Sequence, residues 1–99
     1  MEIRIQAIHF DASQQLEAFV QKKVSKLEKY LDGILTAEVV LKVVKPESAL
    51  NKEVSIKLEV PNQDFFAGKT TDTFEESIVE AVNALEKQLL KFKEKQRAK

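Results

Sequence analysis

The feature that most constrains the fold of this chain is a stretch in which every second residue is apolar. Residues 53–60 place Val54, Ile56, Leu58 and Val60 between charged or polar neighbours. A period of two is typical of a β-strand with one buried face and one face in water. Such a strand needs neighbouring strands and a single covering layer, which the rest of the chain must supply.

Shorter stretches of the same kind, at residues 3–7, 39–43 and 64–69, predict three more strands. Two other segments, residues 16–31 and 74–92, space their apolar side chains by threes and fours, which predicts amphipathic helices. The order is β-α-β-β-β-α. We therefore predict a two-layer α+β fold, a four-stranded sheet with both helices packed on one face.

Local signals mark the helix ends. Ser13 is placed to cap the first helix, and Gly33 to end it in a left-handed conformation. The second helix has the form of a capping box, with Asp72 at the N-cap and Glu75 reaching back to it.

Nothing in the composition divides the chain. Its 99 residues suit a single core, and its two Gly and two Pro form no linker. We expect one domain, 1–99, whose basic helix end at 86–99 frays.

Several kinds of site are excluded or disfavoured by residue counts. With no Cys and one His, the chain cannot build a disulfide, a Cys nucleophile or an ordinary Cys/His zinc site. His9 is better explained as a strand-end residue with a local hydrogen bond. Gly33 and Gly68 lie too far apart in sequence for a phosphate-binding loop. We expect neither an enzyme nor a cofactor.

Four acidic residues near the start of the last helix allow one other interpretation. They would serve an acid/base pair or a Mg²⁺ site of a small hydrolase. Helix capping and solvation explain them more simply. They are Asp72, Glu75, Glu76 and Glu80.

The N-terminus offers no targeting signal. Charged and apolar residues alternate from the first positions, unlike a signal peptide, and no apolar run approaches membrane-spanning length. We expect a cytoplasmic protein with no membrane partner and no small-molecule substrate.

Charge is unevenly distributed although the formal net charge is zero. Residues 22–29 carry four bases against one acid, and residues 86–99 carry six bases against two. The remaining residues must be correspondingly acidic. A segregated charge distribution can steer an anionic partner even when the total cancels.

The basic residues form rows on the two predicted helices. At about 100° per residue, Lys22, Lys26 and Lys29 share one outward arc, while Lys23 falls beside the apolar stripe. Residues Lys87, Lys91 and Lys95 repeat every four positions. Two such rows would fit two lines of phosphates. The alternative is a solvated helix face whose lysines complement the helix dipole, and the spacing alone does not decide between them.

Two adjacent aromatic residues, Phe65 and Phe66, must point to opposite faces of their strand. One on the open face could stack on a base, but packing beneath a neighbouring loop is the simpler interpretation. A second function class also uses this face: a homodimerising protein-interaction module with Val40, Val44 and one of these phenylalanines at its interface.

The motifs that carry a family resemblance lie on the two helices. Residues 19–30, which include Lys26-Leu27-Glu28-Lys29-Tyr30, are followed by the strand pair before Pro61-Asn62 and by residues 84–91. Together they resemble the ribosome hibernation-promoting factors, a family that includes ribosome-associated inhibitor A, the ribosomal subunit interface proteins and the sigma-fifty-four modulation proteins. The resemblance covers the whole chain.

The resemblance implies a fold like that of a double-stranded RNA-binding domain. It implies binding to the small ribosomal subunit and its rRNA in the channel of messenger and transfer RNA, which silences translation in stressed or stationary cells. The basic positions that match the family's RNA contacts on the two helices are Lys23, Lys26, Lys29, Lys87, Lys91 and Lys95, and Lys69, just before the last helix, resembles a basic position in some members.

The chain also departs from the family pattern. Ala84 stands where several relatives have Lys, Phe74 replaces a Tyr, and the start of the last helix is unusually acidic. We expect a short form, without the second domain of the long members, and we expect it to be monomeric when free.

Overall fold

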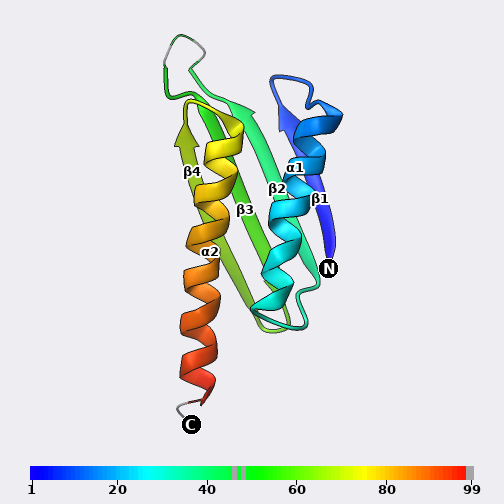
Figure 1. Ribbon diagram of the computed structural model, residues 1–99, viewed down its shortest axis with the longest axis vertical. Helices are drawn as coiled ribbons and strands as arrows, with labels where there is room; N and C mark the ends of the chain where they lie inside the picture. The colour runs from blue at the N-terminus through cyan, green and yellow to red at the C-terminus, as the bar shows by residue number, and fades with distance from the viewer. Residues whose placement is uncertain (46, 48, 98–99) are drawn as a thin grey trace.

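The computed structural model describes residues 1–45, 47 and 49–97, which form the predicted β-α-β-β-β-α order (Figure 1). Residues 46 and 48, and residues 98 and 99 of the basic helix end expected at 86–99, lie outside the described residues. The elements are β1 (Glu2–Ile8), α1 (Gln14–Ser25), the 3₁₀ helix η1 (Lys26–Lys29), β2 (Thr36–Val43), β3 (Lys52–Val60), β4 (Gln63–Thr71) and α2 (Phe74–Arg97).

The four strands form one sheet in the order β1-β2-β3-β4. β1 and β2 are parallel, and the other two pairs are antiparallel. A parallel pair needs a crossover connection, which α1 and η1 provide. Both helices lie on the same face of the sheet and run toward the same end of it, the lower end in Figure 1. The predicted two-layer α+β architecture is confirmed.

The core lies between the sheet and the two helices. The alternation in β3 is confirmed, because Val54, Ile56 and Leu58 are fully buried. Each such side chain contributes about 1.5–3 kcal/mol by leaving water. Aromatic pairs close the two ends of the core: the rings of Phe10 and Phe74 stack at 4.6 Å, and those of Phe65 and Phe92 meet edge to face at 5.4 Å.

The first helix starts as predicted and ends differently. Ser13 Oγ accepts a hydrogen bond from the backbone N–H of Leu16 at 3.0 Å, which confirms the N-cap. The α-helix ends at Ser25, however, and continues as the 3₁₀ turn η1. Tight turns of this kind commonly finish helices, and here the turn carries Leu27 fully into the core. Gly33 then adopts the expected left-handed conformation, at φ +89°.

The N-cap of α2 is Thr73, so the prediction of Asp72 was wrong by one residue. Thr73 Oγ1 accepts from the backbone N–H of Glu76 at 3.1 Å. Thr73 is held in place by Thr71, whose hydroxyl donates to the Thr73 carbonyl at 2.7 Å. Asp72 instead hydrogen-bonds the Glu76 side chain, and this bond, with a smaller contribution from burial and repulsion, raises the pKa of Glu76.

A buried serine joins the start of α2 to the sheet. Ser77 Oγ donates to the carbonyl of Lys52 on β3 at 2.7 Å and accepts from the backbone N–H of Thr71 on β4 at 3.0 Å. Its side chain is fully buried. A buried hydroxyl of this kind is stable only when its hydrogen bonds are satisfied, so this cluster fixes where α2 begins.

The position of the cap is testable by two neighbouring substitutions. Thr73→Ala is expected to lower the free energy of unfolding by about 0.5–2 kcal/mol, because the N–H of Glu76 loses its acceptor. Asp72→Ala is expected to lower the free energy of unfolding by less than Thr73→Ala does, and also to lower the pKa of Glu76. Urea denaturation measures the first effect, and carboxyl titration by NMR the second. A larger loss in Asp72→Ala than in Thr73→Ala would contradict the assignment.

Candidate nucleic-acid interface

The first basic segment, residues 22–29, spans the end of α1 and the whole of η1. Lys22, Lys26 and Lys29 are exposed. Side chains three residues apart eclipse one another in a 3₁₀ helix, so Lys26 and Lys29 point the same way and the predicted row survives the change of helix type. The one acid of the segment, Glu28, lies 3.8 Å from the N-terminal ammonium of Met1. This exposed pair offsets part of the charge of Glu28.

Lys23 differs from the other lysines of this segment. It is half-buried, beside the apolar stripe as predicted. Its Nζ lies 5.5 Å from the centre of the Phe19 ring, one helical turn earlier. A cation over an aromatic face contributes about 0.5–1 kcal/mol when exposed. Lys23 is thus partly held against the protein, unlike the outward row.

The second basic segment is the last part of α2. Lys87, Lys91 and Lys95 are all exposed. Lys91 and Lys95 line a cleft of about 570 Å³ whose other wall is the start of β4. The second row thus turns from the outward surface of α2 toward the β4 edge of the sheet.

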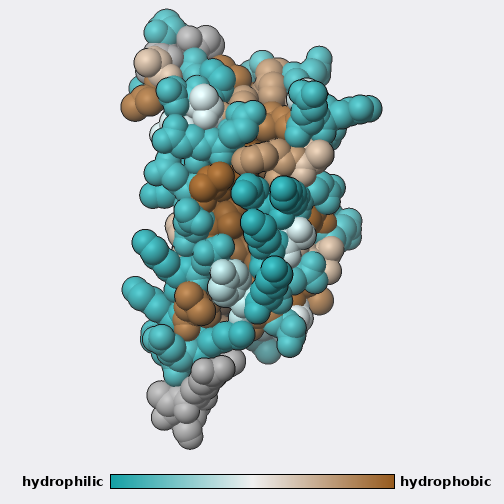
Figure 2. Space-filling model, viewed as in Figure 1, coloured by the Kyte–Doolittle hydropathy of each residue, from teal (hydrophilic) through white to brown (hydrophobic). Residues whose placement is uncertain are grey.

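The topology brings the two rows to the same end of the molecule. α1 with η1 and α2 run side by side across one face of the sheet, and each carries its lysines in its last turns (Figure 1). The space-filling view shows hydrophilic side chains over most of this helical face, with apolar patches between the helices (Figure 2). Residues 22–29 and 87–95, far apart in sequence, therefore lie at the same end of the helical side of the molecule, and we call their exposed lysines the basic surface.

Lys69 is not part of the basic surface. It is exposed near the end of β4, and its alternation with the buried Phe65 and Ala67 places it on the helix-bearing side. Six residues separate it from Gln63 at the lower end of the strand, a span of roughly 20 Å. Lys69 lies instead toward the acidic start of α2.

That acidic start offers little as a catalytic site. Asp72, Glu75, Glu76 and Glu80 are all exposed, and the Asp72–Glu76 contact is accounted for above. Among residues 1–45, 47 and 49–97, no group of three or more His, Cys, Asp or Glu side chains is arranged to hold a metal ion. His9 sits just after β1, with its Nδ1 3.3 Å from the carbonyl of Val43 at the end of β2, so its hydrogen bond joins two neighbouring strands and is not local in sequence.

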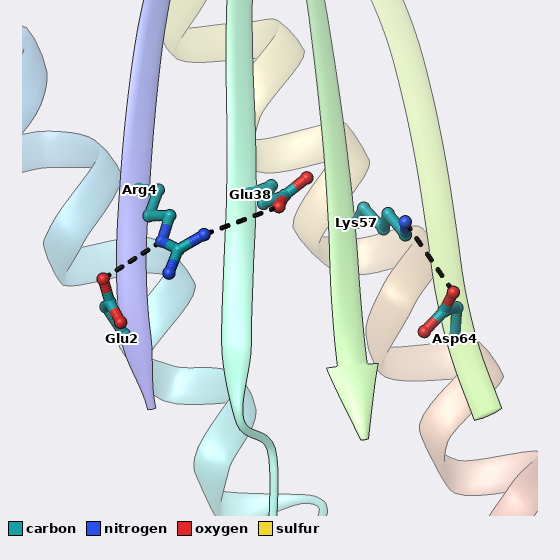
Figure 3. A network of polar contacts seen from close by, with 5 residues as sticks. All are labelled: Glu2, Arg4, Glu38, Lys57 and Asp64. Atoms are coloured by element: carbon teal, nitrogen blue, oxygen red, sulfur yellow. Dashed lines mark hydrogen bonds and ion pairs between the residues drawn. The ribbon is translucent and has the colours of Figure 1, made fainter. Parts of the chain in front are cut away.

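The opposite, open face of the sheet carries ion pairs (Figure 3). Arg4 Nε lies 3.0 Å from Glu2, and its Nη1 lies 4.0 Å from Glu38 across the parallel strand pair. Lys57 Nζ lies 3.8 Å from Asp64 on the neighbouring strand. Hydrogen bonding to Arg4, helped by its charge, lowers the pKa of Glu2.

Acidic residues gather on the open face of the sheet. They lie at the same end of the molecule as the basic surface, which is on the helical face. The strand register aligns Glu2, Thr36, Glu59 and Asp64 in one row across all four strands. This row carries three acids and no base. The open face is only weakly acidic, because Arg4, Lys42 and Lys57 offset part of its negative charge, and further acids lie at the start of α2.

Phe66 lies on the open face and is 59% exposed, whereas Phe65 packs in the core. The interpretation that both would be covered, one by a neighbouring loop, was therefore wrong. The helices cover only the other face, and hairpin pairing puts Phe66 beside Lys57. Val40 also faces this side, between Gln6 and Ser55, and is half-buried; Val44 follows β2 and is half-buried as well.

Sequence reasoning missed the cleft beside Lys91 and Lys95. Its walls are residues about 25 positions apart in the chain, and no spacing rule connects them.

In the described part of the chain, no helix is both long and apolar enough to cross a membrane.

Comparison with known proteins identifies the family. The family described as "Sigma 54 modulation protein / S30EA ribosomal protein" matches residues 3–97. A ribosome hibernation promoting factor of Pseudomonas putida is 29% identical over 98 residues, covering 99% of this chain and 92% of that protein.

Solved structures share the fold. The N-terminal domain of Protein Y from Thermus thermophilus superposes with a TM-score of 0.79 at 25% identity, over 93% of this chain and 99% of that one. A ribosomal subunit interface protein from Coxiella burnetii gives a TM-score of 0.83 at 24% identity, over 94% and 98%. With the family match spanning nearly all of its residues, the chain belongs to the Sigma 54 modulation protein / S30EA ribosomal protein family.

Proposed function

We propose that this chain is a ribosome hibernation factor that binds the small ribosomal subunit through its basic surface. The observation that carries the proposal is the meeting of two basic segments, residues 22–29 and 87–95, at one end of the helical face. The names of its relatives, ribosome hibernation promoting factors, supply the biological context. A ribosome-bound role places the protein in the cytoplasm.

The polarity of the domain supports one orientation on the ribosome. Phosphates are attracted to the basic surface, whereas the bases Arg4 and Lys57 of the other face are already paired with acids. The helices would therefore face rRNA, and the sheet would face away. Lys22, Lys26 and Lys29 would follow one line of phosphates.

On α2, the lysines Lys87, Lys91 and Lys95 would follow a second line of phosphates. Lys23 would contribute less, because its ammonium is already held over Phe19. Lys69 would reach only RNA that extends along the domain toward the start of α2.

Inhibition would require no covalent chemistry. A domain bound in the channel of messenger and transfer RNA blocks both sterically. Initiation therefore stops while the domain is bound. Its contacts would go mainly to phosphates and to the shape of the RNA rather than to base edges. Each neutralised phosphate releases a counterion, so affinity falls as salt rises.

A salt series tests this function directly. The purified chain should co-sediment with the small subunit at low salt, and messenger RNA should compete with it. With six or more phosphate contacts, affinity should fall by about 10³ or more between 50 and 200 mM salt. Binding that favours the large subunit, or that ignores salt, would contradict the proposal.

The second candidate, a homodimerising module, is favoured by one observation only. Phe66 is exposed beside the half-buried Val40 on the open face. The ion pairs around Arg4 and Lys57 interrupt that face, so its apolar residues form no continuous patch (Figure 3). We therefore expect a monomer when the protein is free.

A further inference from the structure

The cleft beside the basic surface has the dimensions of a ligand site. It measures about 570 Å³ and lies between the start of β4 and the second half of α2. Small-molecule sites commonly measure about 300–1,000 Å³, so the space suffices for one nucleotide. The cleft adjoins the basic surface through Lys91 and Lys95, which belong to both.

The base of the cleft is apolar. Phe65 is only 5% exposed, and its ring meets that of Phe92 edge to face at 5.4 Å. Phe92 is partly buried and joins β4 to α2 at this point. Nucleobases pack well against aromatic side chains, because every base presents a π-face.

Amide groups lie at both walls. Gln88 Nε2 donates to the carbonyl of Phe66 at 2.8 Å, which fixes the side-chain amide of α2 against the edge strand. Gln63 is exposed at the start of β4, opposite Gln88. An amide both donates and accepts hydrogen bonds, so these groups suit the mixed donors and acceptors of a base edge.

The charges of the cleft are divided between its walls. Lys91 and Lys95 stand on the α2 side. On the β4 side, Asp64 is drawn toward Lys57, at 3.8 Å, on the open face of the sheet (Figure 3). The charges available to a ligand in the cleft are therefore those of Lys91 and Lys95, and such cations suit a phosphate.

We propose that this cleft holds one unpaired nucleotide of the bound RNA, with its base against Phe92 and between Gln63 and Gln88, and its phosphate on Lys91 and Lys95. The inference deepens the proposed function, on which it rests for the identity of the polymer. Proteins that recognise RNA by sequence or structure typically take splayed-out bases in this way. The site gives the protein a preference for RNA with an unpaired nucleotide next to a helix, which the two lysine rows alone would not give.

Titration with mononucleotides tests the cleft apart from the ribosome. ¹⁵N-labelled protein is titrated with AMP and with CMP, and separately with inorganic phosphate at equal ionic strength. The expected result is a shift of the backbone amides of residues 63–65 and 88–92 with a nucleotide, and a smaller, different response with phosphate. Identical shifts with phosphate and with nucleotide would reduce the cleft to a phosphate contact and overturn the proposal.

Two variants locate the binding. Gln63→Trp places a large side chain in the cleft and is expected to weaken nucleotide binding by about tenfold or more, equivalent to about 1.4 kcal/mol. Gln6→Trp, on the open face of β1, is the matched control and should bind as the wild type does. Gln63→Ala, which removes the amide without adding bulk, serves if the Trp variant folds poorly. Unchanged binding in the folded Gln63 variants would overturn the assignment.

The ribosome assay separates this proposal from the proposed function. Gln63→Trp retains every lysine and should keep the salt dependence of ribosome binding. Ribosome binding without nucleotide-specific shifts would overturn the cleft assignment and leave the proposed function standing. Nucleotide shifts without ribosome binding would support the cleft and contradict the proposed function.

Discussion

Replacing Lys26 and Lys91 together by glutamate is expected to abolish ribosome binding in the co-sedimentation assay. Each lysine is exposed at the centre of its row, so neither reversal disturbs the core. A hydrogen bond to a charged group contributes about 1.5–3 kcal/mol. The loss of two such contacts therefore lowers affinity by roughly a hundredfold or more, and repulsion of phosphates adds to this. The slope of log affinity against log salt should also become shallower by about one for each lost contact.

The matched control makes the same charge change on the other face. Lys42→Glu/Lys57→Glu alters two bases of the open face. The exposed Lys57–Asp64 pair contributes at most about 1 kcal/mol, so this variant should fold and bind ribosomes as the wild type does. Equal loss in both double variants would mean that net charge, not the basic surface, governs binding. A dimer that depends on the sheet face would persist in Lys26→Glu/Lys91→Glu and weaken in the control.

Leu85→Ala is expected to cause a large loss of stability. Leu85 is fully buried, and removing a large aliphatic side chain from a packed core costs about 2–5 kcal/mol through lost burial and the cavity left behind. In a domain of this size each kcal/mol lowers Tm by about 4–8 °C. Thermal unfolding followed by circular dichroism measures the change.

Leu90→Ala is the control for that experiment. The residue lies on the same helix and is 46% exposed, so truncation removes less buried area than at Leu85, and Ala favours the helix. We expect a change within about 0.5 kcal/mol. Comparable losses at both positions would contradict the packing of α2 described above.

Local pattern determined much of the fold and part of the candidate interface. The alternation at Val54, Ile56 and Leu58 predicted the buried face of β3, because strand geometry alone sends alternate side chains to opposite sides. Ser13 capped the first helix as predicted, since a cap depends on residues within one turn. The exposure of the lysine rows also followed from helical periodicity.

Other local features needed the tertiary contacts around them. The N-cap moved from Asp72 to Thr73, because Ser77 ties the start of α2 to both β3 and β4. Phe66 stayed uncovered because both helices pack on the other face. In each case the local sequence allowed more than one arrangement, and contacts between residues distant in sequence decided which one formed.

By itself, then, the sequence determined the elements, their buried faces and the clustering of charge along the chain, because each of these depends on neighbours within a few residues. Only the tertiary structure decided that the two basic segments meet. The parallel β1–β2 pair requires a return crossover, so α1 and α2 run the same way and their basic ends share one end of the molecule. The register of the four strands likewise gathered Glu2, Glu59 and Asp64 on the opposite face. The cleft between β4 and α2 arises from packing alone, because its walls meet only when the helix folds back over the sheet.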